Sequence, residues 1–154
     1  MIIVIVLVVV IVVGVVGAIA AYSYINFATS STSNLRLPRS VNLVNGQITV
    51  QPGQYNYYYF TIPTGATGIT LTGSFTASGG GGNDIEVLVM DQTNFANWKN
   101  GHQSSSYYDS GQVITGTVHA SLPASGTYDL VYSNSFSTVS SKKVQTTVFL
   151  YYLA

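Results

Sequence analysis

Residues 1–21 read MIIVIVLVVVIVVGVVGAIAA, and this stretch divides the chain into an apolar part and a polar part. It has no charged, amide or hydroxyl side chain, and the apolar run continues with small interruptions to Ala28. A helix of this length would span about 42 Å, and about 20 apolar residues suffice to cross a hydrocarbon core. In apolar surroundings a helix is the only single segment that satisfies its own backbone. We therefore predict a long hydrophobic helix over residues 1–28.

Three roles are open to this segment. It could be a secretory signal peptide, since Ala18-Ile19-Ala20 is similar to a cleavage site, or a signal anchor that spans the membrane once. Both roles favour a basic residue before the apolar run, and Met1 leads directly into it, whereas Arg36 and Arg39 lie after it. The third role removes this conflict, because a short basic leader would already have been cut from a mature chain.

The third role is that of a pilin. An aliphatic run, a Gly/Ala-rich second half and then Tyr22 and Tyr24 resemble the N-terminal segment of archaeal type IV pilins and archaellins. Position 5 is Ile5, not the Glu of bacterial pilins, which favours the archaeal branch. The resemblance implies that the helix packs in a filament core. The residues expected in this assembly helix are Ile2, Ile3, Val4, Ile5, Val6, Leu7, Val8, Val9, Val10, Ile11, Gly14, Gly17, Ala18 and Ala21. Its small residues recur at four-residue spacing, which allows close helix packing.

Charge is scarce in the whole chain. Only 6% of the residues are charged, against about 25% in an average soluble protein, and the net charge is zero. Because there is no basic patch, we expect no nucleic-acid partner. The low charge leaves little repulsion between copies of the chain. There is no cysteine, so disulfides and thiolate metal sites are excluded.

A Ser/Thr-rich linker is predicted over residues 29–40, followed by a β-sandwich domain over residues 41–154. From Val41 the apolar pattern has a period of two, and turn signals recur at regular intervals, which indicates about eight strands. Asn45-Gly46 predicts a hairpin turn and Pro52-Gly53 a second turn. We predict strands near 55–62, 69–77, 84–91, 107–119, 122–134 and 143–152, with a polar loop from residue 91 to Ser106. The expected fold class is α+β: one long N-terminal hydrophobic helix followed by an antiparallel jelly-roll or immunoglobulin-like sandwich.

The last third of the chain suggests a second family. Residues 125–150, SGTYDLVYSNSFSTVSSKKVQTTVFL, resemble the end of the GOLD (Golgi-dynamics) domain, and the likeness extends more loosely over residues 47–152. The motif positions are Gly126, Tyr128, Asn134, Phe136, Ser137, Lys142 and Lys143. The resemblance implies a compact β-sandwich that makes protein–protein contacts. It carries over no catalytic residue.

No pattern in the sequence indicates catalysis. Asp84 and Glu86 are two apart and would share one face of a strand, but no calcium-loop spacing surrounds them. His102 and His119 have no second ligand at a metal-binding spacing, and there is no nucleophile-elbow motif. We therefore expect no enzyme activity, no cofactor and no metal.

The loop at residues 95–108 collects aromatic side chains, including the single tryptophan. Trp98, Tyr107 and Tyr108 stand beside Asn and Gln residues, a combination that suits sugar binding or subunit contact. The other interpretation is that Trp98 caps the core of the sandwich. The sequence leaves both open.

Together these observations favour a structural subunit of an extracellular cell-surface filament. The helices would bundle in the core, copies of the chain would be the partners, and the membrane would hold the helix before assembly. The first alternative is a single-pass, membrane-anchored extracellular GOLD-like binding domain. The second is a secreted carbohydrate-binding adhesin with a surface or glycan ligand.

Overall fold

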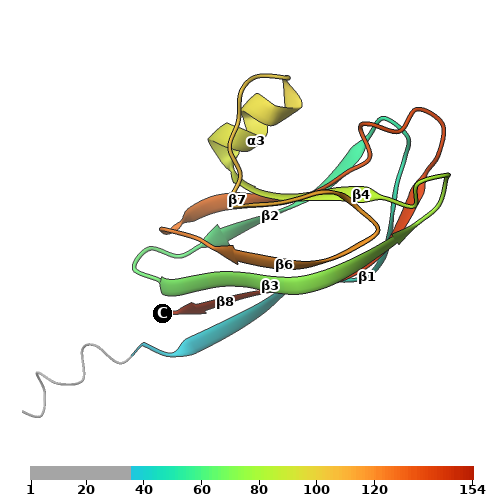
Figure 1. Cartoon of the computed structure of the whole chain (residues 1–154). Coiled ribbons are helices and arrows are strands. Elements are labelled where there is room, and N and C mark those ends of the chain that lie inside the picture. The colour runs from blue at the N-terminus through green and yellow to red at the C-terminus, as the bar shows by residue number, and fades with distance from the viewer. Residues whose placement is uncertain (1–35) are drawn as a thin grey trace, which may run out of the picture. The chain divides into compact units, whose positions relative to one another are not determined.

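A computed structural model describes residues 36–154, in which eight strands and one short helix follow one another (Figure 1). The elements are β1 (Pro38–Val50), β2 (Tyr55–Ile62), β3 (Thr67–Ser78), β4 (Ile85–Asp91), α3 (Gln92–Lys99), β5 (Tyr108–Val113), β6 (Thr115–Ser121), β7 (Gly126–Ser133) and β8 (Lys142–Leu153). β1 begins three residues before the predicted start of the domain. Pro38 is tolerated there because the first residue of an edge strand need not donate a ladder hydrogen bond.

The strands form two four-stranded sheets. Sheet A has the order β1-β8-β3-β6 and sheet B the order β2-β7-β4-β5, and every paired neighbour is antiparallel. Consecutive strands alternate between sheet A and sheet B, except that β4 and β5 both belong to sheet B. This is the strand order of a jelly roll. The predicted antiparallel sandwich of about eight strands is therefore present in residues 38–153.

The predicted α+β class is wrong for the part of the chain that the structure describes. Within residues 36–154 the only helix is α3, which has eight residues, and 61% of these residues are in strands. The fold there is all-β. None of the helices in this range is long and apolar enough to cross a membrane. The predicted helix over residues 1–28, with all its assembly residues, lies outside the described residues.

The main core lies between the two sheets. Each strand contributes alternate side chains to this core, because successive side chains of a pleated strand point to opposite faces. In β8, buried and more accessible residues alternate along most of the strand. In β2 the same period sends Tyr58, Phe60 and Ile62 inward and leaves Tyr57 and Tyr59 on the outer face of sheet B. The outer face of sheet B is therefore aromatic, and it becomes the site discussed below.

The predicted hairpin at Asn45-Gly46 is wrong. β1 continues through both residues, which pair with Thr147 and Thr146 of β8. Gly46 adopts a positive φ of 140° within the strand, and Asn45 Oδ1 accepts a hydrogen bond from Thr147 Oγ1 at 3.0 Å. A long partner strand thus overrides the local turn signal. The turn at Pro52-Gly53 is confirmed.

Candidate functional site

Helix α3 replaces the first half of the predicted polar loop after β4. Asp91 caps it: the Asn94 backbone N–H donates to Asp91 Oδ1, and Asn94 Nδ2 donates to Oδ2, both at 2.8 Å. These hydrogen bonds lower the pKa of Asp91, and the bond from the Asn94 backbone has the largest effect. Asn94 Oδ1 also accepts from the Ser105 backbone N–H at 2.9 Å, so the returning loop is tied to the helix. The cap signal was present in the sequence as Asp91 at the end of a strand.

The helix packs on the outer face of sheet B over a second, small core. Leu88 and Met90 of β4, Val131 of β7 and Phe95 of α3 are its buried members, and Tyr55 and Trp98 pack against it. The Phe95 and Trp98 rings stack with centroids 6.1 Å apart, and Tyr55 meets Trp98 edge-to-face at 5.1 Å. Apolar side chains on the outer face of a sheet need such a cover, and α3 supplies it.

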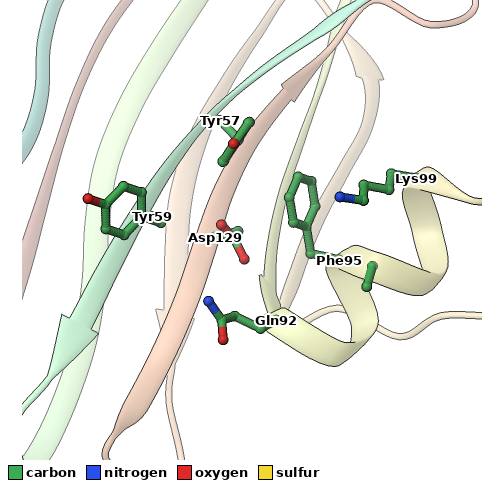
Figure 2. Close-up of a pocket in the computed structure, with 7 residues that line it drawn as sticks. Tyr57, Tyr59, Gln92, Phe95, Lys99 and Asp129 are labelled. Carbon is green, nitrogen blue, oxygen red and sulfur yellow. The ribbon is translucent and has the colours of Figure 1, made fainter.

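Beside α3 this cover ends and leaves an open groove of about 420 Å³. Figure 2 shows side chains that line it, drawn from β2, β7 and α3. The lining residues are Tyr57, Tyr59, Gln92, Phe95, Ala96, Lys99 and Asp129. The groove is thus aromatic on the β2 side and amphipathic on the helix side.

Two tyrosines give the groove exposed ring surface. Tyr57 and Tyr59 are 52% and 73% exposed, although both lie in the middle of a strand. Tyr57 also packs against Phe95, with ring centroids 5.0 Å apart. Exposed aromatic rings next to one another on a rigid sheet are a common feature of binding surfaces.

Asp129 is the most unusual residue of the groove. It is only 3% exposed, and its Oδ2 atom has no hydrogen-bond partner among the residues that the structure describes. Burial raises the pKa of Asp129, and the positive charge of Lys99 opposes this shift. A buried carboxylate oxygen without a donor costs free energy. Such a group in a concave site indicates a functional role.

Lys99 does not neutralise Asp129 by direct contact. Its Nζ atom lies 5.6 Å from the centroid of the Phe95 ring, a cation–π geometry at the edge of the groove. Lys142 and Asp84 form an ion pair elsewhere in the domain, at 2.8 Å. The carboxylate of Asp129 therefore lines the groove without a direct contact from Lys99.

The predicted contact residues of the loop at 95–108 are not brought together as one surface. Trp98 is half-buried in the small core under α3, which matches the interpretation that it packs against the sandwich. Tyr108 packs against the main core. Tyr107 remains 38% exposed, and its hydroxyl reaches Asp91 Oδ2 at 3.5 Å.

Five GOLD-like motif residues lie at the connection from β7 to β8 or at the start of β8, two lie at the start of β7, and none lines the groove. Asn134 is buried, and its Nδ2 donates to the carbonyls of Val50, Gln51 and Ser140 at 2.9–3.2 Å. Ser137 Oγ donates to the Ser140 carbonyl at 3.1 Å, which closes the same turn.

The other motif positions have structural contacts of the same kind. Lys142 Nζ pairs with Asp84 and lies 5.9 Å from the Phe136 ring centroid. Tyr128 is buried and stacks on Phe60, Gly126 starts β7 with a φ of 150°, and Lys143 is exposed. These contacts hold the fold together, and the structure places no motif residue in the groove.

The carboxylates Asp84 and Glu86 do not act as a pair. Asp84 precedes β4 and bonds Lys142, which lowers the pKa of its carboxyl. Burial raises the pKa of Glu86, and the charge of Asp109 adds to this effect. Within residues 36–154 no group of three or more His, Cys, Asp or Glu side chains has metal-binding geometry.

The sequence pointed to part of the groove only. Three lining residues, Phe95, Ala96 and Lys99, fall in the loop at residues 95–108 that was put forward for sugar binding or subunit contact, although none of them was named as a contact residue. A second signal was in β2, where tyrosines occupy both faces of the strand and one face therefore has to meet something other than water. Gln92 and Asp129 had no signal, because nothing local to them shows which elements pack together.

Comparison with known proteins does not assign a family. No family model matches the chain, and no curated protein matches it. One similar solved structure is entitled "CBM4 structure and function". The alignment covers 75% of this chain and 79% of that one, with 15% identity and a TM-score of 0.43.

Two further structures match the same share of the chain. The first is PliG from Aeromonas hydrophila, a periplasmic inhibitor of g-type lysozyme, which is 16% identical over 83% of its length, with a TM-score of 0.35. The second is a mutant of CBM29-2, a family 29 carbohydrate-binding module, which is 10% identical over 81% of its length, with a TM-score of 0.36. Likeness at this level says nothing about the ligand, so function has to be argued from the groove.

Proposed function

We propose that residues 36–154 form a binding domain for carbohydrate and that the groove between β2 and α3 is its binding site. The observation that carries the proposal is the meeting of exposed aromatic rings with a buried carboxylate that lacks a donor. The aromatic rings match the apolar faces of a sugar ring, and the carboxylate matches its hydroxyl groups.

The aromatic part matches the apolar faces of a pyranose. The C–H bonds of such a ring carry a slight positive charge, and the face of an aromatic ring is negative, so the two attract each other as they pack. Tyr57 and Tyr59 have large exposed areas and lie two residues apart on the same side of a rigid strand. Little conformational entropy is lost when a ligand settles on such side chains.

The polar part matches the hydroxyl groups at the rim of the sugar. A carboxylate accepts O–H donors strongly, and the bond is stronger where water is excluded. Asp129 supplies such an acceptor, and the amide of Gln92 lies at the same groove as both donor and acceptor. The volume of about 420 Å³ is within the range of small-ligand sites.

The test is a titration of the full-length chain with a panel of soluble oligosaccharides, followed by calorimetry and by NMR of the tyrosine rings. We expect saturable binding that Tyr57→Ala and Tyr59→Ala weaken. If no saccharide binds, or if binding is unchanged in the Tyr57→Ala/Tyr59→Ala double variant, the groove is not a sugar site.

The prediction of a filament subunit finds no support in the described residues. It depends on residues 1–28, about which the structure says nothing. The second alternative, a carbohydrate-binding adhesin, agrees best with the groove, although its sugar-binding residues are not the predicted Trp98, Tyr107 and Tyr108.

A further inference from the structure

The groove has an uneven distribution of charge. Asp129 lies at its base and is 3% exposed, whereas Lys99 is exposed on the last turn of α3, with its ammonium near the Phe95 ring. Figure 2 shows Asp129 between the β2 tyrosines and the side chains of α3. A ligand that fills the groove therefore meets a buried negative charge at the bottom and a solvated positive charge at the rim.

The two charges do not have equal strength. Interaction with a buried charge is screened little, whereas water screens an exposed ammonium strongly. The strand pairing fixes Asp129 from both sides, because it lies opposite Tyr59 of β2 and Met90 of β4. This pairing fixes the backbone position of Asp129 in sheet B, and its side chain lines the groove.

The protein does not provide a donor for Asp129 Oδ2 within residues 36–154. Of its two cross-strand neighbours, Met90 has no donor. The Tyr59 hydroxyl points away from the carboxylate in Figure 2. Asp129 lines the groove, so a ligand group that meets its carboxylate there forms a hydrogen bond only if that group carries a hydrogen.

From these contacts we infer that the groove selects saccharides by charge: it binds uncharged sugars whose hydroxyl donates to Asp129 and rejects sugars that bring a carboxylate to that place. This inference rests on the proposed function. A hydroxyl gains a charge-assisted hydrogen bond there. A second carboxylate would be placed beside a like charge in a poorly solvated site, which is strongly unfavourable.

The experiment compares one neutral oligosaccharide with the same oligosaccharide oxidised to carboxylates at C6. The probes are a gluco-oligosaccharide and a manno-oligosaccharide, each with its C6-oxidised form. Affinities for the full-length chain are measured by calorimetry at neutral pH. We expect each neutral saccharide that binds to do so at least about tenfold more tightly than its oxidised form.

Two variants assign the selectivity to Asp129. Asp129→Asn keeps the shape of the side chain and removes the charge, so affinity for the neutral sugar should fall and affinity for the oxidised sugar should rise. Asp109→Asn is the matched control: it removes the same charge from an exposed position on β5 of the same sheet, outside the groove. It should leave the ratio of the two affinities unchanged.

The outcomes separate the two proposals. If neither neutral nor oxidised saccharides bind, the proposed function fails. If a saccharide binds through Tyr57 and Tyr59 but its oxidised form binds equally well, the carbohydrate function stands and the charge selection is wrong. The selection is also wrong if Asp109→Asn changes the affinity ratio as much as Asp129→Asn does.

Discussion

Asp129 of β7 and Tyr59 of β2 are direct partners in the antiparallel register of sheet B, and both line the same groove. Yet Tyr59 is 73% exposed and Asp129 only 3%. Helix α3 contacts β4 and β7, and its rings reach Tyr55 and Tyr57 of β2, whereas Tyr59 is left largely exposed. The pairing places a solvated ring directly next to a desolvated charge, and this contrast is the basis of the first two predictions.

Tyr59→Ala should weaken saccharide binding about tenfold or more and leave stability almost unchanged. The ring is largely exposed, so its removal creates no cavity, and the free energy of unfolding should change by about 0.5 kcal/mol or less. Calorimetric titration and urea denaturation measure the two effects. Tyr151→Ala is the control, since Tyr151 is a 43% exposed tyrosine on a strand of sheet A. Equal loss of binding in both variants would contradict the assignment of the groove.

Asp129→Asn should stabilise the protein at neutral pH by about 1 kcal/mol, because it removes a buried charge without a donor. Burial raises the pKa of Asp129 in the folded state, so the folded state holds its proton to a higher pH than the unfolded state. Stability of the wild type therefore falls as pH rises from the ordinary aspartate pKa to the raised one.

Thermal unfolding at a series of pH values tests this dependence. The stabilisation by Asp129→Asn should be small near pH 3, where both states of the wild type are protonated, and should grow as pH rises. A variant that is less stable than the wild type at pH 7 would show that Asp129 has a stabilising partner.

Asp84→Asn should destabilise the fold more than Lys142→Met does. Lys142 Nζ is 2.8 Å from Asp84 Oδ1, and the lysine side chain is 3% exposed. Loss of the carboxylate leaves a buried ammonium unpaired, which we expect to cost roughly 3 kcal/mol, whereas Lys142→Met removes the buried charge itself.

The same pair predicts a loss of stability in acid. The hydrogen bond from Lys142 lowers the folded-state pKa of Asp84. Its contribution is thus complete above the ordinary aspartate pKa and is lost as pH falls through the lowered value. Urea denaturation at pH 7 and below should show this loss in the wild type but not in Asp84→Asn. Equal pH profiles would contradict the assignment to this pair.

Asn134→Ala should lower the free energy of unfolding by about 3 kcal/mol. Its buried side-chain amide donates to the carbonyls of Val50, Gln51 and Ser140. The substitution removes all three hydrogen bonds at once, each of which contributes about 1 kcal/mol. Ser135→Ala, at the exposed neighbouring position, is the control and should change stability far less. Denaturant unfolding compares the two variants, and a similar small effect in both would mean that water replaces the amide.

Trp98→Ala should destabilise the protein by about 2 kcal/mol but should leave saccharide affinity little changed. Its ring packs against Phe95 and Tyr55 in the small core under α3 and does not line the groove. Calorimetric titration below the unfolding temperature, with Trp98→Phe as a packing control, measures both effects. Loss of binding in both variants at full folding would favour the original aromatic-loop site.

Most of the sandwich could be predicted from local pattern. Strand β2 was predicted with its observed bounds, because YNYYYFTI is rich in residues that favour strands and is bounded by turn residues. α3 was missed, since QTNFANWK is short, polar and without a clear apolar stripe. Its formation depends on the Asp91 cap and on the Phe95 contact with sheet B. Asn45-Gly46 failed for the opposite reason: its strong turn signal is overridden by pairing with β8, about a hundred residues later.

The sequence by itself determined the low charge, the β-rich body and the alternation that divides each strand into an inner and an outer face, because these depend only on composition and on a period of two residues. The partition into two sheets, the position of α3 and the approach of Asp129 to Tyr59 were decided only by the tertiary structure. Residues 59 and 129 are far apart in the chain, and their pairing depends on which strands are neighbours. Local periodicity contains no information about that choice, so the groove is visible only once the sheets have formed.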